Sequence, residues 1–351
     1  MSYQGIENLT DFKVEPYLLA DEEGRDCFVV MVKATYQIYG NGALSIAPEQ
    51  KELIPEGQYW GEPGQSSIKY APESCFTKNA TDVVLIGHAH APQGRQVTQL
   101  DVGLRVGNLS KIARVIGDRY WVRQQGILGN RWQQTEVQPF SKMPLVYERA
   151  FGGQDLSPDD EKDHVYEARN LVGTGMIAKN SKLTQVRMPN IEDIEQPIKS
   201  ISDRPAPTGF GAISPDWQPR LTYAGTCDEA WQQDRMPLLP SDFDRRYFNF
   251  ASPGLVAQGF LKGHEEIDLL NLTPNGRLRT YLPGHQPIVL FSFDYEEEKR
   301  LSTMLDAVII NSDDLTLTLL WRACQNVYNR IYAINKVVVK HGHLQLNQAV
   351  A

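Results

Sequence analysis

His88 and His90 are the residues whose spacing most closely resembles a metal site. They stand two positions apart in a predicted strand, so both imidazoles point to the same face of it. A zinc ion needs a third and a fourth ligand, and no carboxylate lies at a ligand spacing beside His88. Two histidines on a strand face, each with local hydrogen bonds, are the simpler interpretation. We therefore expect no bound metal and no cofactor.

A second candidate is the run formed by Asp242, Asp244, Arg245 and Arg246. Two carboxylates could share acid and base roles, as they do in glycoside hydrolases. Two adjacent guanidinium groups would lower the pKa of both carboxyl groups, which suits an ion-pair network better than a general acid. The run is therefore predicted to organise structure.

Tyr147, Glu148 and Arg149 form a third group, placed between apolar residues at 145–146 and a Phe-Gly-Gly segment at 151–153. These flanks predict that the charges are paired and partly buried. Our hypothesis is that this group and the run at 242–246 hold long loops in place through ion pairs and hydrogen bonds.

Motifs for nucleophilic and nucleotide chemistry are missing from the sequence. It contains no Gly-x-Ser-x-Gly elbow and no phosphate loop of the Gly-x-x-x-x-Gly-Lys type. Gly173-Thr174-Gly175 lacks the strand-turn-helix context that such a loop needs. We predict no catalytic residues and no enzymatic activity.

The composition narrows the class of partner. The chain has 351 residues, with 35 Lys and Arg against 43 Asp and Glu, which gives a net charge of −8. Sequence-independent binding to nucleic acid requires a basic surplus, so nucleic acid is not expected as the main ligand. No apolar run approaches the roughly 18 residues of a membrane span, and the N-terminus lacks a secretory pattern. Four widely spaced cysteines indicate reduced thiols, and we expect a cytoplasmic protein without membrane insertion.

Strand patterns dominate the sequence. In 97–106, apolar residues alternate with polar ones, the period of a half-buried strand. A short helix is predicted at 227–235, with Thr226 as its N-cap and Met236-Pro237 ending it. We predict an all-β protein, a multi-stranded antiparallel β-sandwich with a long ordered loop region. The predicted strands lie at 27–38, 81–90, 97–106, 266–272, 277–282, 288–293, 307–310 and 315–321.

Residues 139–253 differ in kind, because they hold 12 of the 21 prolines. Proline removes a ladder donor, so this region is predicted to consist of long loops and short edge elements. We expect one domain over 1–351, with 1–138 and 254–340 as possible tightly joined lobes bridged by this region. Long loops in compact domains are usually functional, so the binding surface is expected here.

Several ordered strings in the chain resemble the bacterial family labelled domain of unknown function 2169 (DUF2169). The resemblance covers about residues 25 to 325. The strings are Asp82–Ala89, Gly117–Arg119, Met143–Gly153, Pro189–Glu192, Gly209–Gly211, Ala224–Thr226 and Leu239–Asp244.

The resemblance implies a role in the type VI secretion system. Members of the family look like cytoplasmic adaptors or chaperones that help to load a toxin effector, often one with a PAAR-like domain, onto the VgrG spike. They are not enzymes, and the family offers no assigned binding residues. Which effector is bound, the oligomeric state and whether the protein is co-secreted are not implied.

Two surfaces could serve such an adaptor. Aromatic rings of the loop region, such as Trp217, Trp231 and Tyr247, could anchor a partner. Alternatively these rings belong to the core, and an exposed sheet edge captures a partner strand. The residues alone also leave open a carbohydrate-binding or glycoside-processing β-sandwich. Exposed rings along a concave strip would favour carbohydrate binding, and two facing carboxylates in a cleft would favour a hydrolase.

Overall fold

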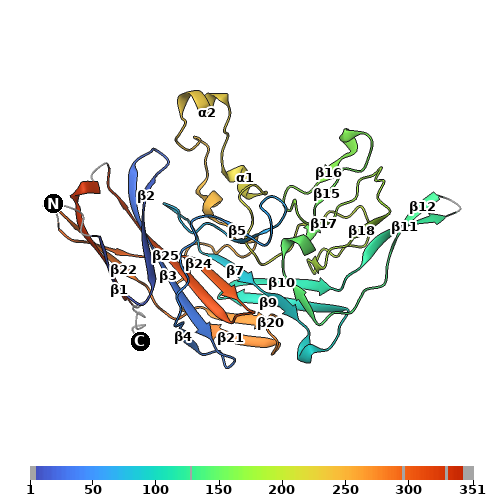
Figure 1. The fold of residues 1–351 in the computed structure, drawn as a ribbon, viewed down its shortest axis with the longest axis horizontal. Coiled ribbons are helices and arrows are strands. Elements are labelled where there is room, and N and C mark those ends of the chain that lie inside the picture. Colours follow the sequence, from blue (N-terminus) through green and yellow to red (C-terminus); the bar gives the residue numbers. More distant parts are fainter. Residues whose placement is uncertain (1–4, 127–128, 295–296, 329–330, 343–351) are drawn as a thin grey trace, which may run out of the picture.

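A mixed β-sheet forms the centre of the molecule (Figure 1). The computed structural model describes residues 5–126, 129–294, 297–328 and 331–342. The central sheet runs in the order β2-β3-β25-β24-β7, with β4 added beside β3. Its strands are β2 (Lys13–Ala20), β3 (Asp26–Ile38), β4 (Leu44–Ile46), β7 (Asp82–Ile86), β24 (Met304–Asn311) and β25 (Thr316–Asn326).

The all-β prediction is confirmed, because strands prevail and helices are short. The β-branched and aromatic run at 27–38 forms β3, whose side chains are almost all buried. Three strand pairs are parallel, however: β24 with β7, β1 with β26 and β14 with β17. These pairs differ from the antiparallel pairing that was expected for the sandwich.

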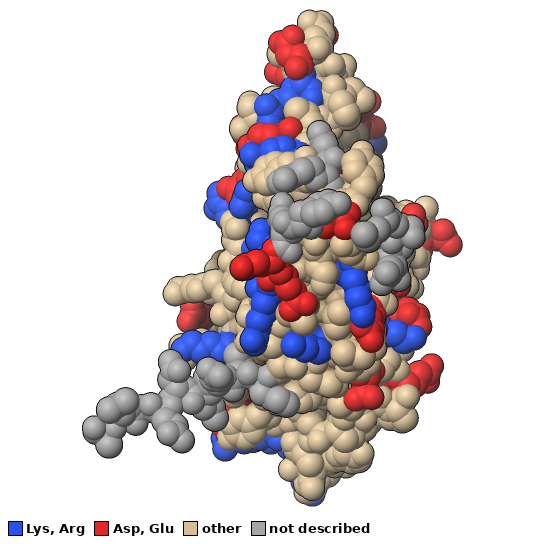
Figure 2. Space-filling view, turned by 90° about the vertical axis from the view of Figure 1, so that its left-hand side faces the viewer, with Lys and Arg blue, Asp and Glu red and all other residues tan. Residues whose placement is uncertain are grey.

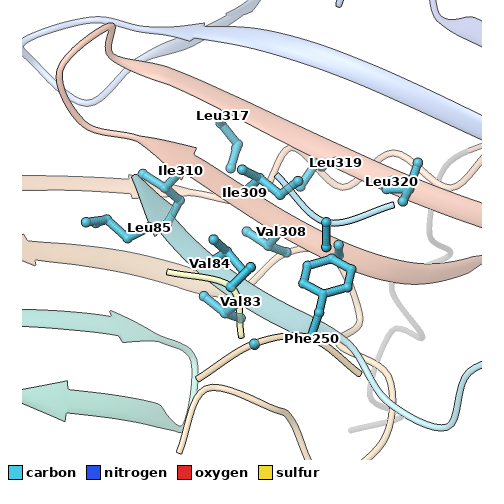
Figure 3. Packing of buried hydrophobic residues seen from close by; sticks show 14 of the residues in the cluster. Val83, Val84, Leu85, Phe250, Val308, Ile309, Ile310, Leu317, Leu319 and Leu320 are labelled. Carbon is cyan, nitrogen blue, oxygen red and sulfur yellow. The ribbon is translucent and has the colours of Figure 1, made fainter. Parts of the chain in front are cut away.

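The two faces of the central sheet differ in chemistry. Cross-strand partners share a face, so the register places Ala34, Tyr36, Leu317, Leu319 and Trp321 on one apolar face. Figure 3 shows buried side chains of β7, β24 and β25, of which Leu85, Ile310 and Leu317 belong to this face. A four-stranded sheet contributes to the same core, since the Phe28 ring meets Phe291 edge-on at 5.8 Å between centroids. This sheet runs in the order β1 (Ile6–Leu9), β26 (Ile334–Lys340), β22 (Ile288–Phe293) and β23 (Lys299–Ser302).

The opposite face of the central sheet carries buried charges. Lys33 and Arg322 project from β3 and β25, and Asp82 and Asp306 project from β7 and β24. All four side chains are almost inaccessible to solvent. The segment 47–81 covers this face and includes β5 (Gln58–Tyr59) and β6 (Ile68–Tyr70). Burial of charge on this scale requires internal partners.

A five-stranded sheet contributes its buried side chains to the same hydrophobic core (Figure 1). The alternation predicted for 97–106 is confirmed here, because Val102, Leu104 and Val106 are buried and Gln99 is exposed. The sheet runs in the order β19 (Ile191–Glu192), β10 (Leu109–Ile116), β9 (Gln99–Val106), β20 (Glu266–Leu270) and β21 (Arg277–Tyr281).

The N-terminal and C-terminal thirds are interleaved. Strand β3 pairs with β25, β7 with β24, and β9 with β20. Residues 1–138 and 254–340 therefore contribute strands to the same sheets.

The region 139–253 has short elements, as predicted. A satellite apolar cluster of Trp121, Ile177 and Met188 lies beside its strands. Strand β18 (Gln185–Arg187) of this region joins two strands that precede it, β11 (Tyr120–Gly126) and β12 (Gly129–Gln134), in a three-stranded sheet of order β12-β11-β18. The region also contains β13 (Lys142–Pro144), β14 (Phe151–Gly152), β15 (Gln154–Asp155), β16 (Val165–Tyr166) and β17 (Thr174–Gly175), and β13 pairs with β8 (His88–His90) from outside it.

The helical elements are short throughout the described chain. The two α-helices are α1 (Arg220–Tyr223) and α2 (Glu229–Asp234). The single-turn 3₁₀ helices are η1 (Pro92–Gly94), η2 (Tyr147–Arg149), η3 (Glu161–Asp163), η4 (Arg245–Phe248) and η5 (Ile331–Ala333). Within the described residues, none of these helices is long and apolar enough to cross a membrane.

Candidate functional site: a projecting arm

One excursion of the loop region stands away from the sheets, at the top of Figure 1. We call residues 220–248, which contain α1, α2 and η4, the arm. The first and the last residues of the arm lie side by side, because the Asp244 amide donates to the Tyr223 carbonyl at 2.9 Å. Helix α2 buries none of its residues, so apolar packing alone does not hold the arm in shape.

Side-chain hydrogen bonds fix the interior of the arm. The Trp231 indole Nε1 donates to the Leu238 carbonyl at 2.8 Å, and the Arg235 Nε donates to the Leu239 carbonyl at 2.5 Å. The Asp242 carboxylate accepts from the Thr226 amide and hydroxyl at 2.8 and 2.7 Å. Hydrogen bonds therefore join the outgoing and the returning segments of the arm at several points along its length.

The predicted helix is present, but its start is different. Asp228, not Thr226, is the N-cap, and its side chain accepts from the Trp231 amide at 2.9 Å. Thr226 instead donates hydrogen bonds from its amide and its hydroxyl to the Asp242 carboxylate. Gly225, at φ +79°, allows the outgoing and the returning segments of the arm to approach each other, because a Cβ there would lie 2.8 Å from an Asp242 carboxylate oxygen.

The turn between β2 and β3 supports the arm from the side. Glu22 in this turn accepts from the Arg245 Nε at 2.5 Å, and its carbonyl accepts from an Arg235 guanidinium nitrogen at 3.1 Å. Gly24 lies against Leu238, where a Cβ would approach the leucine side chain to 2.6 Å. Glu22 holds two arginines of the arm, a role that its position in the sequence did not reveal.

The base of the arm carries the other predicted residues. Asp244 accepts from the Arg246 amide and guanidinium, and the Arg246 guanidinium lies 4.3 Å from the Tyr223 ring centroid. The Arg220 guanidinium lies 5.3 Å from the Tyr247 ring centroid. The run at 242–246 thus organises the loop, although Asp242 binds a threonine and not an arginine.

The outer surface of the arm exposes apolar side chains. Met236 is 62% exposed and Leu221 is 49% exposed, and Cys227 is also exposed. Trp231 and Tyr247 are only half-buried against the arm itself. Met236 and Leu221 are the large apolar side chains that the arm exposes most, and sequence analysis did not single them out.

Trp217 is not a partner anchor. It is 2% exposed and meets the buried Tyr147 edge-on, with 5.6 Å between ring centroids. The Tyr147 ring in turn lies so close to Gly209 that a Cβ there would come within 2.8 Å. Both rings belong to the core, so for Trp217 the structure shows the alternative, a buried ring.

Glu148 and Arg149 lie in the body of the protein, apart from the arm. The Glu148 carboxylate accepts from the Ser67 amide and hydroxyl at 2.7 and 2.8 Å, which fastens the cover segment 47–81. A guanidinium nitrogen of Arg149 donates to Asn190 at 2.9 Å and to Asp118 at 3.2 Å. The two residues therefore contact different loops through separate partners.

Asp118 offers a test of this network. Partial burial raises the pKa of its carboxyl group, but hydrogen bonds from Arg187 and Asn190 outweigh burial, so the net pKa is lowered. The ionised form therefore stabilises the fold above the ordinary pKa of about 4, and this contribution is lost as the pH falls through the lowered folded value. Asp118→Asn should be less stable than wild type at pH 7, and the difference should shrink at pH 3. Urea unfolding at both pH values measures it, and a difference that does not change with pH would contradict the network.

The two histidines of β8 meet a carboxylate that the sequence places far away. The His88 Nδ1 lies 2.6 Å from an Asp313 oxygen, and the His90 Nε2 lies 3.5 Å from the other oxygen. Lys142 adds a cation 3.6 Å from the same carboxylate. Among the described residues, no group of three acidic, histidine or cysteine side chains is placed to hold a metal ion.

The charges on the covered face of the central sheet are paired. Lys33 donates to both oxygens of Glu73, at 2.7 and 2.8 Å, and the Arg322 Nε donates to Asp306 at 2.9 Å. Lys78 lies 2.5 Å from Asp82. Each pair links the sheet to the cover segment or to a neighbouring strand, and the pairs are buried structural contacts.

Comparison with known proteins gives one match to a family. The family described as "Uncharacterized protein conserved in bacteria (DUF2169)" matches residues 23–322. No curated protein matches the chain, and no solved structure matches it.

Proposed function

The chain belongs to the DUF2169 family, and from this premise we propose that it is an adaptor that binds a type VI secretion effector in the cytoplasm. The effector, often one with a PAAR-like domain, would then be passed to the VgrG spike. The family description itself assigns no function. The proposed role therefore rests on the resemblance of the sequence strings. We further propose that the arm makes the contact with the effector.

The observation that carries this proposal is the ordered arm with apolar side chains at its outer surface. A surface fixed before binding loses less conformational entropy when it binds. The hydrogen bonds of Trp231, Arg235 and Asp242 fix the arm, and Met236 and Leu221 remain exposed on it. Such a preformed element with apolar side chains suits protein recognition.

Two sheet edges that could capture a partner strand are covered. The outer edge of β7 is occupied, because the Val83 amide donates to Leu255 and the Leu85 amide donates to Phe210, both at 2.9 Å. The outer edge of β21 meets the turn after β3, where Gly42 packs against the Arg279 carbonyl. Strand capture at these edges would require the covering loops to leave.

The free edge of the central sheet is interrupted by a proline. Among the described strands, β2 pairs only with β3, and Pro16 lies in its middle. Proline has no amide hydrogen to donate to the ladder, so its nitrogen faces away from β3. The outer edge of β2 therefore lacks a donor at its centre, which weakens it as a site for strand addition and favours the arm.

The surface charge is consistent with a protein partner. Figure 2 shows basic and acidic side chains interspersed over one side of the molecule, without an unbroken basic patch on that side. With the net charge of −8, this supports a protein partner over nucleic acid.

The carbohydrate and hydrolase alternative gains no specific support. Of the exposed rings, Tyr166 lies in β16 and Tyr281 lies in β21, which belong to different sheets. Burial raises the pKa of the carboxyl groups of Glu73 and Glu192, as a general acid requires, but each is held by a buried cation. We propose no catalytic role for them.

Co-purification with the effector encoded beside this protein tests the proposal. We expect a tagged effector to retain the protein from lysate and the two to elute together in size-exclusion chromatography. A toxin effector from an unrelated secretion cluster serves as the control and should retain none. If the neighbouring effector is folded and retains no protein at low or moderate salt, the adaptor assignment is wrong.

A further inference from the structure

A cavity of about 300 Å³ lies between the central sheet and the cover segment. Its floor comes from β3, β24 and β25, and its walls come from residues 51–73 of the cover. This volume is at the low end of small-molecule sites. The lining residues are Lys33, Lys51, Glu52, Leu53, Ile54, Gln58, Tyr70, Glu73, Ile309, Asn311 and Thr318.

Most charged side chains at this cavity form ion pairs. Lys33 binds Glu73 at 2.7 Å, and the Glu52 carboxylate lies 2.5 Å from Lys13. Lys51 differs, because within the described chain no carboxylate lies at ion-pair distance from it. Its ammonium group reaches only the Thr316 hydroxyl, at 3.3 Å. One positive charge is therefore left over at the cavity.

The surroundings make this charge costly. Burial lowers the pKa of Lys51, and Asp314 opposes this effect from a distance, while Lys33 and Lys69 reinforce it. The Lys69 ammonium group lies 4.6 Å from the Trp60 ring centroid. A cation in this position is stabilised by an anion that enters the cavity.

The remaining walls define the rest of the ligand. Leu53, Ile54 and Ile309 give the cavity apolar surface, and Leu53 and Ile309 are buried. Tyr70 adds a hydroxyl group beside them, whereas the Asn311 side chain is held by Asp314 and by the Asp313 amide. The apolar lining residues favour a ligand with an apolar body, and Lys51 favours a ligand with a single negative charge.

We propose that this cavity binds a monocarboxylate with a short apolar body, whose carboxylate pairs with Lys51. Two sources share this chemistry: a free small organic acid, and the C-terminal residue of a polypeptide. The proposal is independent of the adaptor role, since it uses no residue of the arm.

Calorimetric titration with four probes tests it. Hexanoate represents the free acid, and N-acetylleucine represents a chain terminus. Hexanamide and N-acetylleucinamide are their neutral counterparts. We expect one or both acids to bind saturably and each amide to bind at least tenfold more weakly than its acid. Tighter binding of N-acetylleucine than of hexanoate would assign the site to a polypeptide terminus, and the reverse order would assign it to a free acid.

Variants locate the binding site. Lys51→Met keeps the length of the side chain and removes the charge, and it should weaken binding of the acids at least tenfold. Lys182→Met removes an exposed lysine paired with Asp159 elsewhere on the surface and should bind as wild type does. Circular dichroism confirms that each variant is folded, and Lys51→Gln serves as a replacement if Lys51→Met is not. The proposal is overturned if no acid binds saturably, if the amides bind as tightly as the acids, or if a folded Lys51 variant binds unchanged.

Discussion

Replacing Asp82 by alanine should lower the free energy of unfolding by about 3 to 5 kcal/mol, the usual cost of breaking a buried ion pair from one side. Asp82 is completely buried in β7 and faces Lys78 at 2.5 Å. Its carboxylate also accepts from the Phe250 and Ala251 amides, both at 3.1 Å. The variant would leave a buried ammonium group and two buried amides without this partner. Equilibrium unfolding in urea measures the loss.

A surface carboxylate provides the matched control. Asp159 pairs with Lys182, but its side chain is 88% exposed. An exposed pair contributes about 0 to 1 kcal/mol, so Asp159→Ala should unfold almost as wild type does. If Asp82→Ala is equally stable, the covered face of the central sheet is hydrated and its ion pairs do not hold the cover segment.

The strands that the sequence predicted best are those with one simple signal. The run at 27–38 contains many β-branched and aromatic residues, and the alternation at 97–106 matches a sheet with one buried face. The predicted strands at 266–272 and 277–282 pair as β20 and β21, and Asn275-Gly276 between them is a sequence that favours a hairpin turn. In each case local pattern and tertiary packing favour the same structure.

The ion pairs of the covered face could not be predicted in the same way. Lys33 interrupts an apolar run, and its partner Glu73 lies 40 residues away in a loop without periodicity. The pairing of β7 with β24 is parallel and joins residues more than 200 positions apart. Short-range patterns contain no information about such partners. The same limit explains why Asp313 beside His88 was missed.

The site was predicted in part. The loop region 139–253 contains the arm, and the run at 242–246 organises it. The ring of Trp217 was assigned by residue type alone, and its burial depends on Tyr147, which comes from another part of the loop region. Glu22, which supports the arm, lies in a turn more than 200 residues before Arg245. Exposure and support both arise from tertiary contacts.

The arm should decide whether the effector binds. Met236→Asp together with Leu221→Asp places two charges on the exposed apolar surface of the arm, and we expect the affinity for the effector to fall about 30-fold or more. This corresponds to a hot-spot cost of about 2 kcal/mol. The fold should survive, because both side chains are largely exposed. Titration of the effector with each purified variant measures the change.

Leu18→Asp is the matched control for this double variant. Leu18 is 51% exposed and lies on β2, the free edge strand, so the substitution has the same chemistry at the competing surface. Under the arm proposal it should leave the affinity unchanged. Arg245→Ala, which removes the contact with Glu22, should weaken binding to a smaller extent, because it loosens the support of the arm and leaves its outer surface intact. If the arm variants bind normally and Leu18→Asp abolishes binding, the effector contacts the sheet edge, and the arm is not the binding surface.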